Sequence, residues 1–203
     1  MIVGIDEVGY GAWAGPLYSV AFCFCNVKNS KEIEINYLDQ IVDSKIIPVK
    51  KREFLAGYLK ENFLYGTASI DNKEIDDINI RNADFKAMKL AYYNLLEKLK
   101  LLSFDVTVEK IFIDGNANPA FSDKIEVVID GDAKIKEISA ASIIAKVERD
   151  NFMKHIHEEF PYYGWDSNVG YGTAKHRSGI QEHGITKYHR CSYKPIKEYL
   201  KNK

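Results

Sequence analysis

The sequence is poor in cysteine and proline, and it has no long hydrophobic segment. Its 203 residues include only 3 cysteines and 5 prolines. An odd, sparse set of cysteines (Cys23, Cys25 and Cys191) argues against a disulfide scaffold or a cysteine-ligated metal, and it favours a reducing, cytoplasmic location. No run of about 18 uncharged apolar residues is present, so we expect no membrane span. Acidic residues at positions 6 and 7 argue against a signal peptide.

The sequence also lacks an excess of charge of either sign. It carries 28 Lys and Arg against 29 Asp and Glu, a formal net charge of -1. Taken alone, this balance argues against a nucleic-acid partner, since proteins that bind phosphate are usually basic. The charge is unevenly distributed, however, because residues 173–203 carry eight Lys or Arg and two Asp or Glu. The acidic remainder allows a cation site beside a surface that binds anions.

Short apolar segments alternate with longer segments of helical periodicity, and no internal repeat or linker is visible. The predicted strands are 1–5, 17–24, 64–70, 110–113 and 125–129, and the predicted helices are 49–63, 81–102 and 137–160. Such alternation predicts an α/β fold with a mixed sheet covered on both faces. We expect a single domain over 1–203, in which residues from about 161 to 203 form a small basic, aromatic appendage.

Three of the predicted strands end in acidic residues. These are Asp6 and Glu7, then Asp114, then Asp130 and Asp132. Ligands of open α/β sheets gather beyond the carboxyl ends of the strands, so the carboxylates could converge there. Converging carboxylates repel one another unless a cation binds them, and oxygen ligands favour Mg²⁺ or Mn²⁺. Two such ions can drive in-line cleavage of a phosphodiester.

A simpler interpretation exists for each acidic segment. Asp followed by Gly after a strand is most often a turn, because Gly adopts positive φ and Asp bonds to its own backbone. Neighbouring residues of a strand also point to opposite faces. We therefore expect Asp6 and Glu7 to share a site only if the first strand ends between them.

Six segments in order resemble the type 2 ribonuclease H family, ribonuclease HII. They are GIDEVGYG (4–11) with AGP (14–16), DSK (43–45) with KKRE (50–53), EIDDINI (74–80) with AM (87–88), DGN (114–116), GDAK (131–134) with ISAASIIAKV (138–147) and RD (149–150), and GYGT (170–173) with His176, His189, Arg190 and Ser192. A single match would be weak, but six in order are specific. The resemblance spans residues 4 to about 197.

This resemblance implies a ribonuclease H-like mixed five-stranded sheet flanked by helices. It implies an Mg²⁺- or Mn²⁺-dependent endonuclease, expected to be a monomer, that cuts the RNA strand of RNA–DNA hybrids and incises at ribonucleotides embedded in duplex DNA. Matched by motif, the catalytic and metal-binding acids are Asp6, Glu7, Asp114 and Asp132. The implied nucleic-acid contacts are Gly9, Tyr10, Gly11, Ser44, Lys45, Lys134, Lys146 and Tyr171.

The sequence departs from the family pattern at positions where positive charge is common. The departures are Tyr10, Asp130, Asn168, Val169 and Cys191. Tyr10 could stack on a base or sugar, or it could pack against Trp13. Lost phosphate contacts leave an alternative open: a nucleic-acid-binding ribonuclease H-like protein with impaired or altered cleavage, active on hybrid tracts but poor at single ribonucleotides. Further candidate phosphate contacts are Arg149, Lys175, Arg177 and Lys194, and His176, His183 and His189 could tune phosphate binding by titration.

Overall fold

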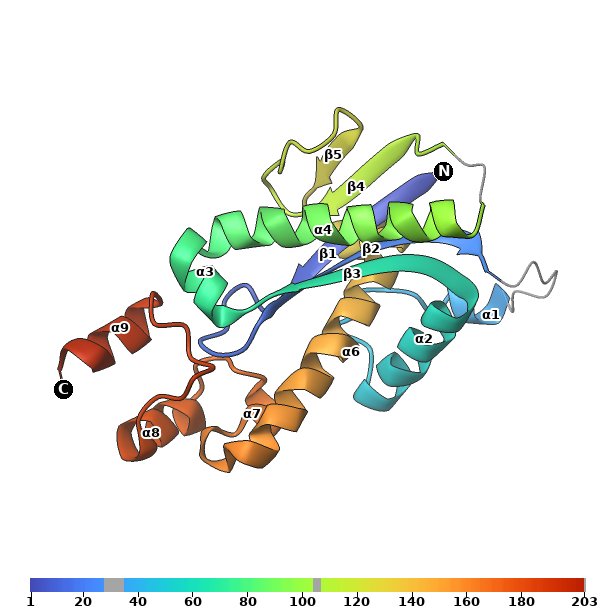
Figure 1. Cartoon of the computed structure of the whole chain (residues 1–203). Coiled ribbons are helices and arrows are strands. Elements are labelled where there is room, and N and C mark those ends of the chain that lie inside the picture. The colour runs from blue at the N-terminus through green and yellow to red at the C-terminus, as the bar shows by residue number, and fades with distance from the viewer. Residues whose placement is uncertain (28–34, 104–106, 203) are drawn as a thin grey trace.

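Five strands and the helices that cover them are arranged as the alternating sequence pattern predicts. The computed structural model describes residues 1–27, 35–103 and 107–202 (Figure 1). The strands are β1 (Ile2–Val8), β2 (Leu17–Asn26), β3 (Phe63–Ile70), β4 (Lys110–Asp114) and β5 (Ile125–Val128). The helices are α1 (Ile35–Leu38), α2 (Val49–Asn62), α3 (Asn72–Ile78), α4 (Ile80–Leu101), α5 (Gly131–Lys134), α6 (Lys136–Glu159), the 3₁₀ turn η1 (Pro161–Tyr163), α7 (Trp165–Asn168), α8 (Ala174–His183) and α9 (Lys194–Lys201).

The sheet is mixed, and its central strand is β1. The strand order is β3-β2-β1-β4-β5. β1 pairs with β2 in antiparallel register and with β4 in parallel register, so that Gly4 lies opposite Phe22 on one side and Phe112 on the other. The parallel pair β4 and β5 directs the residues that follow both strands to the same edge of the sheet as the end of β1.

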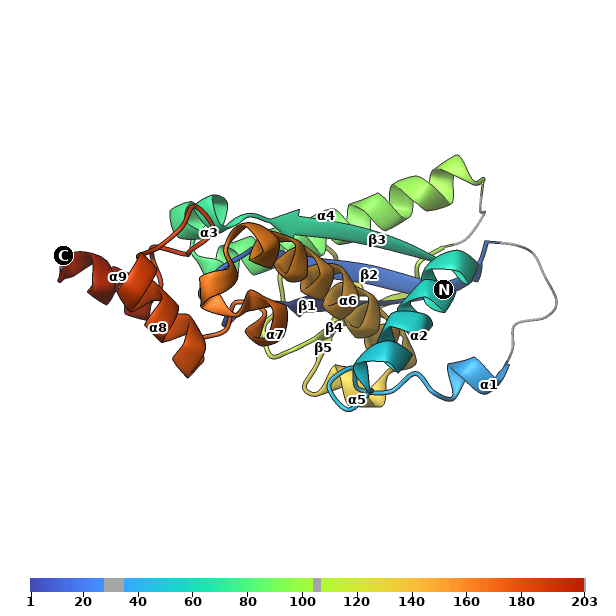
Figure 2. The same ribbon diagram turned by 90° about the horizontal axis from the view of Figure 1, so that it is seen from below.

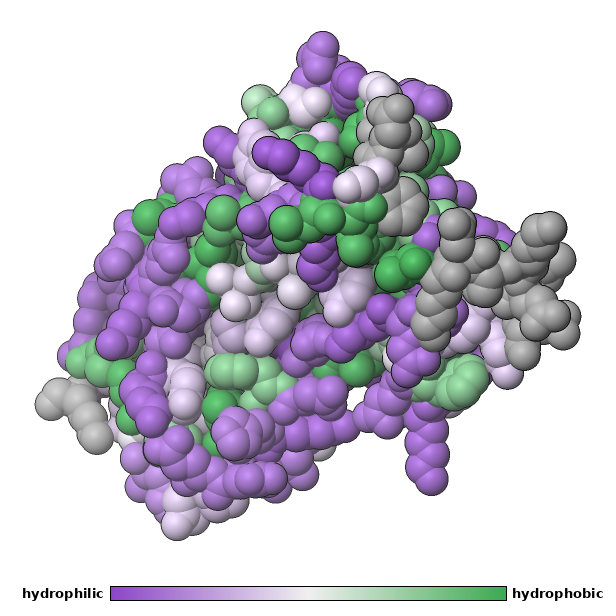
Figure 3. Space-filling view, turned by 45° about the vertical axis from the view of Figure 1, so that its right-hand side comes forward, coloured by the Kyte–Doolittle hydropathy of each residue, from purple (hydrophilic) through white to green (hydrophobic). Residues whose placement is uncertain are grey.

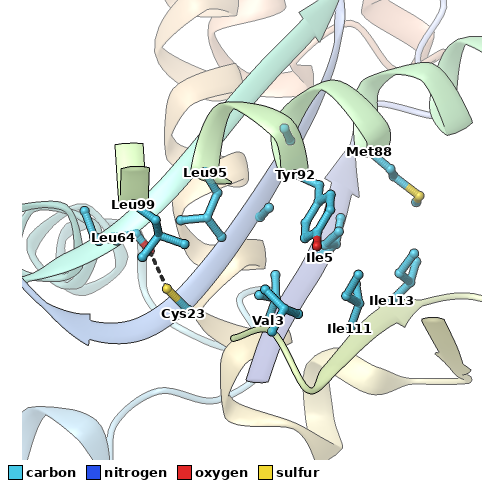
Figure 4. Packing of buried hydrophobic residues seen from close by; sticks show 13 residues of the cluster. Val3, Ile5, Cys23, Leu64, Met88, Tyr92, Leu95, Leu99, Ile111 and Ile113 are labelled. Atoms are coloured by element: carbon cyan, nitrogen blue, oxygen red, sulfur yellow. Dashed lines mark hydrogen bonds between the residues drawn. The ribbon is translucent and has the colours of Figure 1, made fainter. Parts of the chain in front are cut away.

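Each face of the sheet carries its own hydrophobic core. On one face, Val3 and Ile5 of β1 pack with Leu95 and other residues of α4 (Figure 4). On the other face, Phe22 of β2 packs against α2 and Ile144 of α6. Burial of one such side chain contributes roughly 1.5–3 kcal/mol relative to exposure. The alternation of strand side chains therefore decides which residues meet α4 and which meet α6.

A glycine lets α6 lie directly against the central strand. A Cβ atom on Gly4 would lie 2.2 Å from the backbone carbon of Glu137. The first turns of α6 carry small side chains, and Ser139, Ala140 and Ala141 are all buried there. This close approach brings the small-residue start of α6 beside the acidic end of β1.

The C-terminal segment packs on one end of the sheet layer rather than on its faces. Helices α8 and α9 lie beyond that end, far from α1 and α2 (Figures 1 and 2). A separate cluster around Trp165 holds them to Ala14 and to Met153 of α6. The face in Figure 3 is predominantly hydrophilic, with hydrophobic side chains interspersed. Across the described ranges, no helix combines the length and apolar character that crossing a bilayer requires.

Candidate active site

An acidic cavity lies where β1 and β4 end. Its volume is about 370 Å³. It is lined by three of the predicted acids, the predicted loop and several predicted contacts: Asp6, Glu7, Val8, Gly9, Tyr10, Ser44, Lys45, Asp114, Ser142, Lys146 and Tyr171. Residues more than 160 positions apart in the sequence therefore meet at one hollow.

Asp6 and Glu7 reach the same cavity although the strand does not end between them. β1 continues through both residues to Val8, so this part of the sequence-based expectation is wrong. The pairing of β1 with β4 stops at Ile5 opposite Ile113, and Asp114, the last residue of β4, follows at the level of Asp6. Asp6 lies on the α6 side, where Ser142 is its hydrogen-bonding neighbour, and Glu7 lies on the α4 side near Asp84. Both side chains nevertheless line one hollow, together with Asp114 at the end of β4.

The acids of this cavity perturb one another because they are buried together. Burial raises the pKa of Asp6 well above its usual range, and the charges of Glu7 and then Asp114 raise it further. Burial also raises the pKa of Glu7 to about 8, with the charges of Asp84 and Asp114 adding to the effect. The pKa of Asp114 is raised by burial, although a hydrogen bond from the Gly131 N–H (2.6 Å) opposes the rise. Such repulsion favours either protonation or a bound cation.

Asp132 sits next to the cavity and is bound by a lysine. Its carboxylate is buried, with a relative exposure of 4%, and accepts a hydrogen bond from Lys45 Nζ at 3.0 Å. That hydrogen bond is the main cause of the raised pKa of Lys45. Asp130, by contrast, has a left-handed backbone (φ 53°) and an exposed side chain. Of the two neighbouring acids, only Asp132 faces the site.

The chemistry of these donors fits a hard divalent cation, but their present arrangement does not close around one. Among the described residues, no group of three or more Asp, Glu, His or Cys side chains is placed to hold a metal ion. Lys45 Nζ donates a hydrogen bond to the Asp132 carboxylate, and the Gly131 N–H donates one to the Asp114 carboxylate. Side-chain rotation would be needed for ligation. The described lining of the cavity holds carboxylates but no cysteine or histidine, which matches the oxygen ligands that Mg²⁺ and Mn²⁺ prefer.

The loop after β1 is held by two buried arginines. Arg190 donates to the carbonyls of Gly9 (2.7 Å), Tyr10 (3.1 Å) and Gly15 (3.0 Å). Arg149 donates to the carbonyls of Pro16, Ala14 and Val169 at 2.8–3.1 Å. Both side chains are fully buried. Arg149 is therefore not a phosphate contact, contrary to the sequence-based prediction, because its donors are used by the backbone.

Tyr10 replaces the family arginine at the tip of this loop. Its ring is 42% exposed. Trp13 lies against His176 (centroids 5.7 Å apart) and Gly172, and within the described chain no ring contact joins it to Tyr10. The alternative that Tyr10 packs on Trp13 is therefore wrong. Tyr10 instead shares a second hollow with Arg81 of α4, a cation that sequence reasoning missed.

Tyr171 is positioned by a network of neutral histidines. Its carbonyl accepts a hydrogen bond from His176 Nδ1 (3.1 Å), and Gly11 faces its ring, since a Cβ there would lie 3.7 Å away. His176 Nε2 lies 3.1 Å from His189 Nε2 and accepts from the Trp165 indole. Burial lowers the pKa of His176, and it lowers that of His189 to about 3. These two histidines are fixed structural groups, so the idea that they titrate against phosphate is wrong.

The remaining sequence candidates lie outside the cavity. Lys134 donates to the Ile129 carbonyl and lines a different hollow with Phe112. Lys175 contacts Gly164, Arg177 lies over the Trp13 ring (5.3 Å), and Lys194 pairs with Glu198. Asn168, a departure from the family pattern, bonds to Tyr163 and Gly170 and so shapes the turn before Tyr171.

One buried acid of the site was missed by sequence reasoning. Asp84 of α4 is 7% exposed, and burial followed by the charge of Asp6 raises its pKa to about 7. Its position among Ala83, Ala87 and Met88 on the buried stripe of α4 was a usable signal, because an acid on an apolar helix face needs an explanation.

The mixed five-stranded sheet flanked by helices, with acids gathered at the ends of β1 and β4, is a ribonuclease H-like fold. The crystal structure of ribonuclease H2 from Pyrococcus horikoshii OT3 superposes with a TM-score of 0.75 at 22% identity, covering 99% of this chain and 97% of that one. The crystal structure of Bst-RNase HIII in complex with Mn²⁺ gives a TM-score of 0.74 at 17% identity, covering 99% of this chain and 69% of that one. At these identities the likeness shows the fold.

Sequence comparison shows the family. The family model for ribonuclease HII matches residues 3–196. The ribonuclease HII of Pelagibacter ubique is 42% identical over 201 residues, covering 98% of this chain and 99% of the relative. The chain therefore belongs to the ribonuclease HII family and is an endoribonuclease.

Proposed function

We propose that this chain hydrolyses the RNA strand of RNA–DNA hybrids and incises at single ribonucleotides in duplex DNA, with divalent cations held by Asp6, Glu7, Asp114 and Asp132. The supporting observation is the acidic cavity, which gathers three of these carboxylates with Asp132 beside them. The Mn²⁺ complex of its structural relative Bst-RNase HIII supports the choice of ion class.

Bound Mg²⁺ or Mn²⁺ would activate water and stabilise the leaving oxygen. Asp6 and Asp114 would hold the principal ion, and Glu7 and Asp132 would complete the ligand set. Lys45 is 3.0 Å from Asp132 and lines the cavity, so its ammonium is placed to meet a phosphate oxygen once a cation takes over the carboxylate. Lys146 lines the same wall.

We infer that the loop after β1 and Tyr171 recognise the RNA. The 2′-hydroxyl separates RNA from DNA at a given site and can both donate and accept. Because Arg190 occupies the carbonyls of Gly9 and Tyr10, we infer that the loop offers its N–H groups to that hydroxyl. The Tyr171 ring, 37% exposed beside Gly11, would stack beneath the sugar. Ser44, bonded to Ser142 at 2.9 Å, would support this wall of the cavity.

The direct test compares Asp114→Asn with Asp130→Asn in Mg²⁺ and in Mn²⁺. The substrates are a full hybrid and a DNA duplex that carries one ribonucleotide. We expect Asp114→Asn to abolish cleavage of both while remaining folded, because it removes a lining carboxylate. Asp130→Asn removes an exposed acid 16 positions later and should cleave as the wild type does. Wild-type cleavage by Asp114→Asn, or folded wild-type protein that cuts neither substrate, would refute the proposal.

A second candidate is an enzyme that cuts hybrid tracts and handles single ribonucleotides poorly. The exposed phenol of Tyr10 favours it, because a phenol provides no fixed positive charge for the phosphate at the junction. Action as a monomer in the cytoplasm remains a prediction from the sequence.

A further inference from the structure

Asp84 is a buried carboxylate that the four-acid set leaves unexplained. It lies on the second hollow, of about 510 Å³, which Glu7, Tyr10, Arg81 and Asp114 also line. This α4-side hollow shares Glu7, Tyr10 and Asp114 with the acidic cavity. Asp84 therefore faces the acidic residues from the opposite side of the sheet to Lys45 and Ser142.

One oxygen of this carboxylate has no partner in the described structure. Asp84 Oδ1 is inaccessible to solvent and accepts no hydrogen bond from any described residue. Arg81, one turn earlier on the same helix, also lines this hollow, but the two form no ion pair in the described ranges, and the guanidinium lies over the Phe85 ring at 5.5 Å. A buried carboxylate oxygen without a donor is costly unless something absent from the protein satisfies it.

The neighbours of Asp84 add to this cost instead of relieving it. The charge of Asp84 raises the pKa of Glu7, and the charge of Asp6 raises the pKa of Asp84. Glu7, Asp84 and Asp114 thus line this hollow together, and the cation among its described lining residues, Arg81, forms no ion pair with them. An arrangement of buried oxygen ligands that repel one another, beside an open hollow, is resolved by a hard divalent cation.

We propose that Asp84 is a fifth carboxylate of the site and binds a divalent cation together with Glu7 on the α4 side of the sheet. The inference rests on the proposed function, in which Glu7 is already a cation ligand. A cation in this position lies beside Tyr10, where the family pattern has an arginine. It therefore supplies positive charge at the point of the loop where this chain has lost it.

The test measures Mn²⁺ binding to the full chain without substrate. Thermal unfolding is recorded in EDTA and over a Mn²⁺ titration for the wild type, Asp84→Asn and Glu97→Gln, and bound Mn²⁺ is counted by electron paramagnetic resonance. Glu97 is the matched control, because it is an exposed acid 13 residues further along α4. Asp84→Ser provides a second neutral variant should the asparagine be poorly accommodated.

We expect Asp84→Asn to unfold at a higher temperature than the wild type in EDTA, because a repelling charge is gone. Its half-saturating Mn²⁺ concentration should rise by about tenfold or more, since removal even of a group that only hydrogen-bonds to a metal ligand typically costs that much affinity. Such a tenfold loss lowers the stabilisation at a given high Mn²⁺ concentration by about 1.4 kcal/mol. Glu97→Gln should follow the wild type throughout.

Two results overturn the inference, and they differ in what they say of the nuclease. If the wild type binds Mn²⁺ and cleaves, while both Asp84 variants bind Mn²⁺ with wild-type affinity and stoichiometry, Asp84 is no ligand and the four-acid proposal stands. If the wild type neither binds Mn²⁺ nor cleaves in it, both proposals fail together. A Mn²⁺ anomalous peak within coordination distance of Asp84 in a soaked crystal would confirm the site directly.

Discussion

Replacing Arg149 with methionine tests whether the recognition loop is held by buried cations. The guanidinium donates hydrogen bonds of 2.9, 2.8 and 3.1 Å to the carbonyls of Pro16, Val169 and Ala14. It also fills the space beside Gly9, where a Cβ would lie 2.1 Å from its Nε. Methionine retains the straight stem of arginine and removes all three donors.

The expected loss follows from these contacts. Leaving a buried carbonyl without a donor costs roughly 1–3 kcal/mol, so three carbonyls amount to about 3–9 kcal/mol. Arg149 forms no ion pair with a carboxylate among the described residues, so removing this buried cation returns several kcal/mol of desolvation. We therefore expect a net loss in the free energy of unfolding of about 3 kcal/mol, a large part of the ~5–15 kcal/mol typical of a domain. At about 2–4 °C per kcal/mol, the midpoint should fall by roughly 6–12 °C.

Urea unfolding and calorimetry of Arg149→Met, Arg149→Lys and Lys154→Met provide the measurement. Lys154 lies on the same helix, is exposed and pairs with Glu53, so its replacement should change stability by less than about 0.5 kcal/mol. Arg149→Lys keeps the charge but not the planar guanidinium with its several donors. Its loss of stability should lie between that of Lys154→Met and that of Arg149→Met. An Arg149→Met protein within about 1 kcal/mol of the wild type would refute the claim that this arginine holds the loop.

Two further predictions concern the cavity. In EDTA, Glu7 should lower stability progressively as pH rises from about 4.5 to about 8, because its pKa is raised to about 8 and the folded state holds a proton that the unfolded chain has released. Glu7→Gln should flatten this slope in urea unfolding, and an unchanged slope would contradict the prediction. Tyr10→Arg should raise kcat/KM for a single embedded ribonucleotide roughly tenfold relative to a hybrid tract, since one charged hydrogen bond contributes about 1.5–3 kcal/mol. An unchanged ratio of kcat/KM for the two substrates would show that the phenol of Tyr10 does not reduce activity on single ribonucleotides.

Local pattern was enough to predict the sheet and the main helices. The short apolar segments 1–5 and 110–113 correspond to β1 and β4, and the acids at their ends do reach one hollow. The core face of α4 was less visible. Leu102, predicted as part of the helix, lies beyond its end and is half-exposed, whereas Ala83, Ala87 and Ala91 carry much of the contact. Alanines give a weak periodic signal, although they set how closely the helix approaches the sheet.

The parts of the site that sequence reasoning missed depend on contacts between distant segments. Asp84 and Arg81 meet Glu7 and Tyr10 only because α4 crosses the end of β1, more than 70 positions later in the sequence. The sequence also does not show which of its cations are buried. Arg149 and Arg190 belong to family motifs, but only the fold shows that backbone carbonyls use most of their donors. Motif matching assigns importance to such residues without saying whether they touch substrate or scaffold.

Burial and ion pairing use much of the positive charge of the basic segment 173–203. Its charge suggested a surface for phosphate, yet Arg190 is fully buried, Lys187 pairs with Glu159, and Lys194 with Glu198. Much of the positive charge therefore holds the loop or balances local acids. The cations that line the acidic cavity are Lys45 and Lys146, and they come from the acidic part of the chain. The affinity for phosphate should consequently depend more on these two lysines, and on the bound cations, than on the net charge of residues 173–203.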